Sequence, residues 1–117
     1  MNAIRKAIES QYKGTCTVYE YKAVKDEETL ITSTEPVMVL ENQPCKLSFE
    51  HINAVSDGVP VQSMGVKLFI APEIDIKAGS KIVVTQNGVT TEYARSGFPA
   101  IYTNHQEIKL ELFKKFT

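Results

Sequence analysis

The stretch VVTQNGVTTEY, residues 83–93, decides the fold class. Apolar and polar residues alternate on both sides of Asn87-Gly88, which is the pattern of two half-buried strands. Asn-Gly is a preferred pair for a two-residue type I′ turn, because both central residues of that turn have positive φ. The stretch therefore predicts a tight antiparallel hairpin.

Strand patterns of the same kind precede this hairpin. TCTVYEYKAV, residues 15–24, alternates, and the polar segment KDEETLITSTE, residues 25–35, predicts the tip of a second hairpin. PVMVLENQPCKLSFE, residues 36–50, predicts two strands broken at Pro44, because proline lacks the N–H that a central strand needs. Such a break marks an edge, a bulge or a corner around which a strand bends.

Further strands complete the chain. GVKLFIAP, residues 65–72, predicts a compact buried strand, and residues 81–85 predict the strand that enters the Asn-Gly turn. The last strand is EIKLELF, residues 107–113, and a final helical turn through Phe116 is a second interpretation of its end. The alternation in this strand directs three side chains inward: Ile108, Leu110 and Leu112.

One short helix is expected in residues 1–13, over NAIRKAIESQ, with Asn2 as its N-cap and Gly14 after its end. Its apolar residues recur at helical spacing and form one stripe: Ile4, Ala7 and Ile8. A helix this short is marginal in isolation. We therefore expect the stripe to pack on the body of its own chain or on a neighbouring subunit.

These elements amount to about six or seven short strands with closely spaced turns and one helix. The predicted fold is all-β, a small antiparallel barrel or sandwich, with the barrel preferred. A chain of 117 residues is expected to form a single domain, residues 1–117.

The least regular segment is EHINAVSDGVPVQSM, residues 50–64, which contains the turn signal Asp57-Gly58 followed by Pro60. We interpret it as a long loop, and loops of this length in a small domain are usually functional or disordered. A small barrel that displays such a loop suits a subunit of an oligomeric ring, whose loops point into a central channel.

Composition excludes several classes of protein. Thirteen Lys and Arg residues against fourteen Asp and Glu residues give a net charge of −1, which argues against disorder and against bulk neutralisation of nucleic acid. No apolar run approaches the roughly 20 residues of a membrane span. The N-terminal MNAIRKAIESQYKG lacks the apolar core of a signal peptide, so we expect a protein kept in a reducing cytoplasm.

Candidate catalytic residues are few. Cys16 and Cys45 have neither metal-ligand spacing nor a disulfide framework, and we interpret them as buried apolar side chains, with a disulfide as the alternative. Cys45 and His51 form a remote candidate for nucleophilic chemistry, without an orienting third group. His105 is interpreted as a polar side chain that caps a loop. We therefore predict no catalytic residue.

Cofactor sites are likewise not expected. Glu73 and Asp75 flank a turn and either share a cation or, as we prefer, face solvent. GSKIVV, residues 79–84, lacks the preceding glycine of a phosphate loop. Five tyrosines suggest a base-stacking platform only if a basic groove accompanies them, and the sequence shows none: Tyr12, Tyr19, Tyr21, Tyr93 and Tyr102.

A resemblance covers nearly the whole chain. Residues 66–97, VKLFIAPEIDIKAGSKIVVTQNGVTTEYARSG, followed by PAIYTNHQEIKLELF, resemble small proteins of the head–tail joining region of tailed phages and prophages of Gram-positive bacteria. IRKAIESQYKGTCTVYEY and PCKLSFE fit the same pattern. The order of features is similar to that of head-completion proteins of the stopper type, in which a strand like LFIAPEIDI follows the long loop.

The resemblance implies a structural virion protein at the head–tail junction, present in the host cytoplasm before assembly. It implies a small β-barrel in a ring of about twelve copies, with portal and adaptor proteins above, tail proteins below and packaged DNA in the channel, and with no membrane and no cofactor. Candidate ring contacts are the barrel edges, the N-terminal helix and the C-terminal FKKFT. The implied channel loop comprises His51, Ile52, Asn53, Ala54, Val55, Ser56, Asp57, Gly58, Val59, Pro60, Val61, Gln62, Ser63 and Met64.

This loop contains no Lys or Arg, so any closure of a DNA channel would be steric or would use pairing between loops. Two alternatives to the stopper role stay open. One is a tail-completion or minor tail protein. The other, of a different class, is an OB-like nucleic-acid-binding module, which predicts a basic face and salt-sensitive binding.

Overall fold

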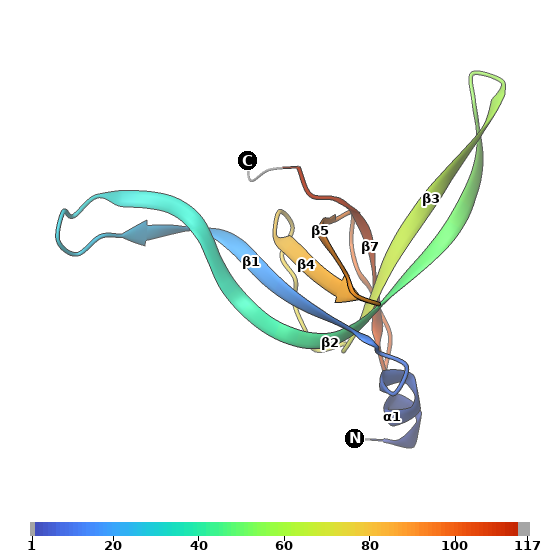
Figure 1. Ribbon diagram of the computed structural model, residues 1–117, viewed down its shortest axis with the longest axis horizontal. Helices are drawn as coiled ribbons and strands as arrows, with labels where there is room; N and C mark the ends of the chain where they lie inside the picture. The colour runs from blue at the N-terminus through green and yellow to red at the C-terminus, as the bar shows by residue number, and fades with distance from the viewer. Residues whose placement is uncertain (1, 115–117) are drawn as a thin grey trace.

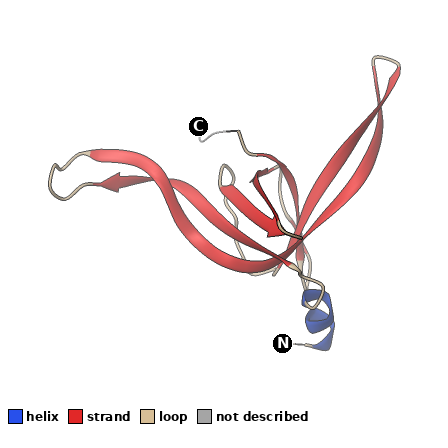
Figure 2. Cartoon of the chain, viewed as in Figure 1, coloured by secondary structure: helices blue, strands red, loops and turns tan. Residues whose placement is uncertain are grey.

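The computed structural model describes residues 2–114, of which residues 52–54, 56 and 60–63 are described by their backbone alone. The chain is mainly β with one short helix, as predicted (Figures 1 and 2). The elements are α1 (Ala3–Glu9), β1 (Gly14–Lys25), β2 (Thr32–Ser56), β3 (Val59–Ile70), β4 (Lys81–Gln86), β5 (Val89–Arg95), β6 (Ala100–Ile101) and β7 (Gln106–Leu112).

The strands form one antiparallel sheet in the order β3-β2-β1-β4-β5-β7-β6. An additional pairing between β3 and β7 joins the two sides of the sheet, so that it closes on itself and leaves the short β6 beside β7. Closure places the inward side chains of alternating strand positions in one apolar core. That core comprises Cys16, Val18, Cys45, Leu47, Leu68, Ile70, Ile76, Ile82, Val84, Tyr93, Ile108 and Leu110.

Two hairpins have the same turn chemistry. Asn87 and Gly88 join β4 to β5 with φ of 54° and 76°, which confirms the predicted type I′ turn. Asp57 and Gly58 join β2 to β3 with φ of 52° and 79°. Asp, Asn and Gly tolerate this left-handed backbone better than other residues, so both turns follow from local sequence.

Pro44 lies at a corner, as one of its predicted roles required. The register pairs Gly14 of β1 with Cys45 of β2, and from Lys46 onward β2 pairs instead with β3 on its other edge. β2 itself is continuous through Pro44, so the predicted break into two strands is wrong. Just before this corner the register shifts between Cys16 and Val18 and again between Val18 and Tyr19, and Asn42 has a φ of 50°.

Two hairpin arms extend beyond the closed sheet. The first arm, residues 20–37, is the outer part of β1 and β2, and the second arm, residues 50–65, is the outer part of β2 and β3 (Figure 1). The radius of gyration is 16.9 Å, compared with roughly 13 Å for a compact domain of this length. The molecule is therefore a small body with two long projections.

Residues 50–64 correct the prediction of a long irregular loop. They form a two-stranded antiparallel hairpin, paired from His51↔Met64 to Ser56↔Val59, with a two-residue turn at the tip. Its described apolar side chains, Val55, Val59 and Met64, are exposed, so no buried face imposes strict alternation at these positions. Pro60 is tolerated because β3 is an edge strand at this level.

Two further expectations are corrected at the chain ends. α1 ends at Glu9 with Ser10 as its C-cap, and Gly14 is the first residue of β1, not the helix stop. Leu112 is 66% exposed although it pairs with the buried Tyr93, so the prediction that it points inward is wrong. Ile108 and Leu110 are buried as predicted. A helical turn through Phe116 lies outside the described residues.

Candidate functional site

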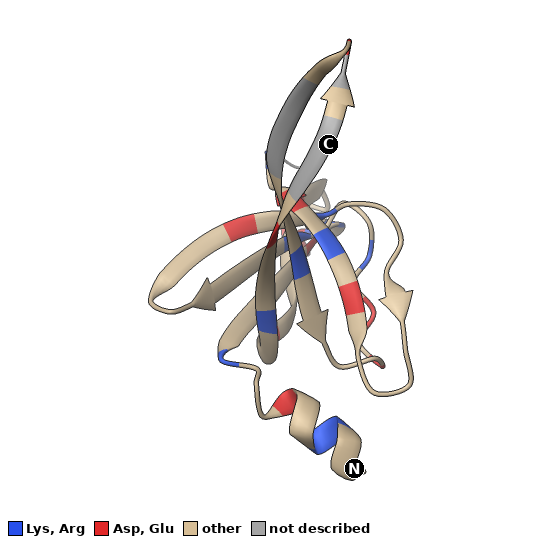
Figure 3. Ribbon diagram, turned by 90° about the vertical axis from the view of Figure 1, so that its right-hand side faces the viewer, with Lys and Arg blue, Asp and Glu red and all other residues tan. Residues whose placement is uncertain are grey.

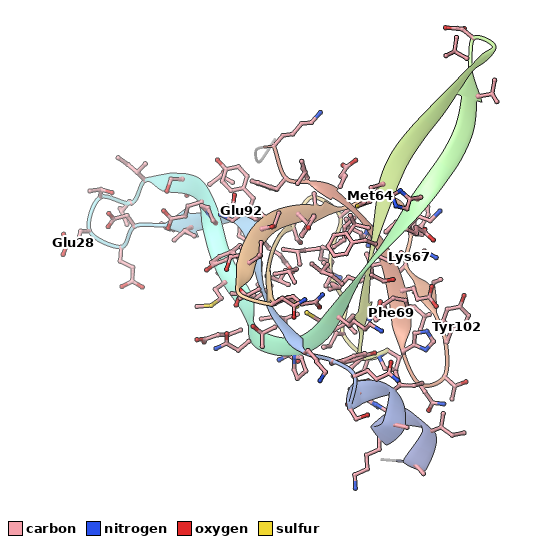
Figure 4. All side chains as sticks on the ribbon, turned by 45° about the vertical axis from the view of Figure 1, so that its right-hand side comes forward. Glu28, Met64, Lys67, Phe69, Glu92 and Tyr102 are labelled. Atoms are coloured by element: carbon pink, nitrogen blue, oxygen red, sulfur yellow. The ribbon has the colours of Figure 1, made fainter. Side chains whose placement is uncertain are left out.

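All predicted channel residues, 51–64, lie in the second arm. One face of this arm continues the core: Leu47 and Leu68 are buried partners, and the pairs Phe49↔Val66 and His51↔Met64 follow along the ribbon. Phe49 is already 53% exposed, and Met64 is exposed as well (Figure 4). An apolar stripe therefore runs from the core out along the arm into solvent.

The opposite face of the arm carries charges at its base. Lys67 Nζ lies 3.5 Å from a Glu107 carboxylate oxygen and 4.0 Å from one of Glu50. These pairs link β2, β3 and β7 where the arm leaves the body. At its base, the second arm is therefore apolar on one face and carries ion pairs on the other.

The tip of the second arm is acidic and apolar. Asp57 stands at the turn, between the exposed side chains of Val55 and Val59. No Lys or Arg occurs in residues 51–64. A tip of this composition has no electrostatic attraction for a phosphate backbone.

Both backbone edges of the second arm lack a partner strand in the described part of the chain. β2 pairs with β1 only up to Cys45, and β3 pairs with β7 only from Val66 onward. An unpaired edge is a row of free N–H and C=O groups that can accept another strand. The second arm therefore offers two such edges to neighbouring molecules.

The helix α1 is attached to the body by polar contacts at its first turns. The Asn2 side chain accepts a hydrogen bond from the Arg5 N–H at 2.7 Å, as the N-cap prediction required. Asn2 also donates to Asn104 at 2.9 Å, and Arg5 pairs with Glu9 and with Glu73. α1 has no buried residue, and Ile4 is 65% exposed. The predicted apolar stripe is thus left largely uncovered by its own body.

A groove separates α1 from the body. It has a volume of about 310 Å³ and is lined by Ala7, Ile8, Gln11, Tyr12, Lys46, Phe69 and His105. A second hollow of about 300 Å³ shares Gln11 and Lys46 with it and adds Lys13. The result is an apolar groove with two ammonium groups at its side.

His105 forms one wall of this groove through stacking. Its ring lies 4.9 Å from the Tyr102 ring and 5.9 Å from the Phe69 ring, and its Nε2 lies 3.0 Å from a Glu107 oxygen. That hydrogen bond lowers the pKa of Glu107. Burial raises this pKa by a smaller amount, and the nearby Lys67 ammonium lowers it further. His105 was predicted to cap a loop, and the structure in addition stacks its ring between those of Tyr102 and Phe69.

Cys16 and Cys45 are buried free thiols, which confirms the preferred prediction over a disulfide. A hydrogen bond with Cys16, together with burial, raises the pKa of the Cys45 thiol. Cys45 faces the core, whereas His51 is exposed on the second arm. They are six positions apart along β2, or about 20 Å. The structure does not bring this candidate nucleophile and base together.

The carboxylates singled out from the sequence are also separate. Glu73 pairs with Arg5, whereas Asp75 pairs with Lys77. Within residues 2–114 no cluster of three potential metal ligands occurs, and no helix there is apolar and long enough to cross a bilayer.

Charged residues of both signs are interspersed over the molecule (Figure 3). Several Lys side chains have carboxylate partners, such as Lys22 with Glu20 and Lys81 with Glu92. The tyrosines are dispersed rather than gathered on one platform: Tyr93 is buried in the core, Tyr12 lines the groove and Tyr21 is on the first arm. The tyrosines therefore do not form the single base-stacking platform that an OB-like module uses.

The chain was compared with known proteins by sequence and by structure. No protein-family model matches the chain, and no curated protein matches it significantly. Among solved structures, the chain is similar to the protein xkdH of the phage-like element PBSX from Bacillus subtilis, with a TM-score of 0.49 and 14% identity. The match covers 84% of this chain and 91% of that one. These values are too low to place the two chains in one family.

The hairpin tip predicted in residues 25–35 is confirmed, but two features of the surface were not foreseen from the sequence. One is the groove beside α1, which depends on residues from four distant segments. The other is the pair of aliphatic side chains, Leu30 and Ile31, that are both exposed on the first-arm turn. Adjacent aliphatic residues inside the otherwise polar KDEETLITSTE are the signal that could have identified this turn.

Proposed function

We propose that this chain is a structural virion protein of the phage head–tail junction, a ring-forming head-completion subunit of the stopper type. The observation that carries the proposal is the second arm, a preformed hairpin that leaves a closed sheet and presents unpaired edges and an uncharged-to-acidic tip. The sequence resemblance supplies the class of assembly, in which such a segment enters a channel.

The closed sheet gives the arm a rigid base. The pairing of β3 with β7 over Val66–Ile70 fixes one strand of the arm, and the core residues Leu47 and Leu68 fix the face from which it leaves. In a ring of copies, every arm would then leave its body at the same angle. Arms held in this way can converge on the ring axis and close the channel sterically.

Edge pairing supplies the contact between converging arms. The free edge of β2 in one copy and that of β3 in the next are complementary in hydrogen-bonding capacity. Pairing of hairpins around the axis needs no charged side chain and leaves no basic residue to hold DNA. A plug of this kind opens by separation of strands when DNA leaves.

The decisive experiment is electron microscopy of virions assembled without this protein. Full heads that lose their DNA support a stopper. Closed, filled heads that carry abnormal tails would overturn it in favour of a tail-completion or minor tail protein. A structural role would be overturned altogether if virions made without the protein assemble normally and wild-type virions do not contain it.

A second experiment separates channel closure from ring assembly. Deletion of residues 51–64, with Glu50 and Gly65 joined by an Asn-Gly turn, shortens the arm and leaves the closed sheet intact. We expect the shortened protein to be incorporated into particles that package DNA and then leak it. Retention of DNA by such particles would contradict the channel role of the arm.

A further inference from the structure

We propose, on the basis of the ring-forming role proposed above, that the first-arm turn of one copy docks in the α1 groove of the next. The docking turn comprises residues 26–31, with Leu30 and Ile31 as its apolar contacts. The α1 groove is the hollow between α1 and the body described above. The contact joins two different surfaces and repeats head to tail around the ring.

The conformation of the docking turn is the first reason. Leu30 has a φ of 60°, a left-handed backbone that costs free energy in every residue with a branched or bulky side chain. Hydrogen bonds hold it there: the Leu30 N–H donates to the Asp26 carbonyl at 2.8 Å, and the Asp26 N–H donates to that of Ile31 at 2.9 Å. The Asp26 side chain also accepts from the Glu28 N–H at 2.8 Å. The turn is thus preorganised.

Its side chains face solvent despite this cost. Leu30 is 68% exposed and Ile31 is 64% exposed. A glycine or asparagine would relieve the strain at position 30 and remove the apolar surface. An aliphatic side chain presented in this way is expected where it is buried by a partner.

The α1 groove has the matching surface. Its walls include the apolar side chains of Ala7, Ile8 and Phe69. A cavity of about 150 Å³ accommodates a benzene molecule, so a groove of about 310 Å³ has room for two aliphatic side chains. The Tyr12 hydroxyl, in the same lining, is buried and has no hydrogen-bond partner in the described structure.

Charge complementarity identifies the occupant as another copy of this chain. The docking turn carries three exposed carboxylates, on Asp26, Glu27 and Glu28, beside one ammonium on Lys25. At the groove, Lys13 and Lys46 form no ion pair within the described residues. Seating Leu30 and Ile31 in the groove would bring this acidic turn next to those two ammonium groups.

The two surfaces also lie at opposite ends of the molecule. Glu28 marks the docking turn at the far end of the first arm, whereas Phe69 and Tyr102 lie near α1 (Figure 4). The longest dimension of the chain is 54 Å. Such a separation prevents the turn from entering its own groove, and two unlike patches on one subunit generate a ring when the rotation closes.

Disulfide trapping in full-length protein tests the contact. Two variants, Leu30→Cys and Ala7→Cys, are mixed with oxidised glutathione at the highest concentration that stays in solution. Because Cys16 and Cys45 are buried, each variant exposes one thiol. We expect the mixed disulfide to predominate over both homodimers. A predominance of either homodimer, or the absence of a cross-link, would overturn the docking.

A matched control uses Leu112→Cys, which is equally exposed but belongs to neither surface. Mixed with Ala7→Cys, it should form far less mixed disulfide than Leu30→Cys does. If the two pairs of variants gave equal yields of mixed disulfide, the cross-link would reflect random collision, and the inference would fail.

Non-covalent variants give a second measurement by sedimentation velocity. Leu30→Asn keeps a residue that tolerates positive φ and should weaken self-association about tenfold or more. Lys46→Glu and Glu28→Lys should each weaken it by up to about fivefold, and the double variant should recover. Unchanged association of Leu30→Asn would contradict the docking.

Virions separate the failure of this contact from the failure of the proposed function. If the protein is present at the head–tail junction but the mixed disulfide does not form there, the docking alone is overturned. If virions do not contain the protein, the structural role is overturned, whatever is observed in solution.

Discussion

Gln86 of β4 binds the backbone of Leu47 in β2 through both ends of its side-chain amide. Its Oε1 accepts from the Leu47 N–H at 2.9 Å, and its Nε2 donates to the Leu47 carbonyl at 3.3 Å. Leu47 is just beyond the point at which β2 leaves β1. The Gln86 amide therefore takes the place of a strand where the sheet has none, at the root of the second arm.

Replacing Gln86 by Ala should lower the free energy of unfolding by about 1–3 kcal/mol, because it leaves two part-buried backbone groups without partners. Hydrogen exchange at the Leu47 amide should accelerate more than exchange at the core strands. Chemical denaturation measures the first effect and NMR the second. Thr90→Ala, on the adjacent exposed strand, is the control and should change stability by less than about 0.5 kcal/mol. Equal stabilities of the two variants would contradict this role of Gln86.

Gly14 makes room for the Gln86 side chain. A Cβ at residue 14 would lie 3.1 Å from Gln86 Oε1 and 3.1 Å from the Thr85 carbonyl oxygen. Gly14→Ala should therefore destabilise the fold by about 1–3 kcal/mol through overpacking. In a double-mutant cycle, the loss in Gly14→Ala/Gln86→Ala should be smaller than the sum of the single losses, because one clash disappears. Strict additivity would show that Gly14 and Gln86 do not interact.

Asp57 sets the charge of the second-arm tip. If arms close a DNA channel, Asp57→Lys should slow DNA ejection, because an ammonium at the tip attracts the phosphate backbone that must pass it. Asp57→Asn is the matched control: asparagine also tolerates a φ of 52°, so it removes charge without disturbing the turn. Ejection rates triggered in vitro at low salt provide the measurement. Equal rates for the Lys and Asn variants would count against a channel position.

The lowered pKa of Glu107 implies that the stability of the fold depends on pH. The His105 hydrogen bond, with help from Lys67, lowers its pKa in the folded state. A lowered pKa stabilises the fold above the unfolded value of about 4.3, and this contribution is lost as pH falls through the folded value. Glu107→Gln should therefore melt at a lower temperature than wild type at pH 7, with the difference vanishing in acid. Glu111→Gln, exposed on the same strand, should show no such trend. A difference that is constant with pH would refute the linkage.

Local sequence determined the elements whose conformation depends on near neighbours. The Asn87-Gly88 turn follows from the positive φ that both residues accept, and the Asn2 cap follows from one side-chain oxygen three residues from its donor. Alternation identified Ile108 and Leu110 as inward positions of β7, where the core covers one face of the strand. The same rule failed at Leu112, the last residue of β7, which is exposed although it pairs with the core residue Tyr93.

The tertiary structure alone decided which strands meet beyond the predicted hairpins. The β3–β7 pairing that closes the sheet, the change of partner by β2 at Cys45 and the projection of residues 50–65 all depend on contacts between segments distant in sequence. No periodicity encodes such contacts, because pairing energy is gained only when the whole sheet is assembled. For the same reason the groove beside α1 and the strained, exposed Leu30 became apparent only in three dimensions.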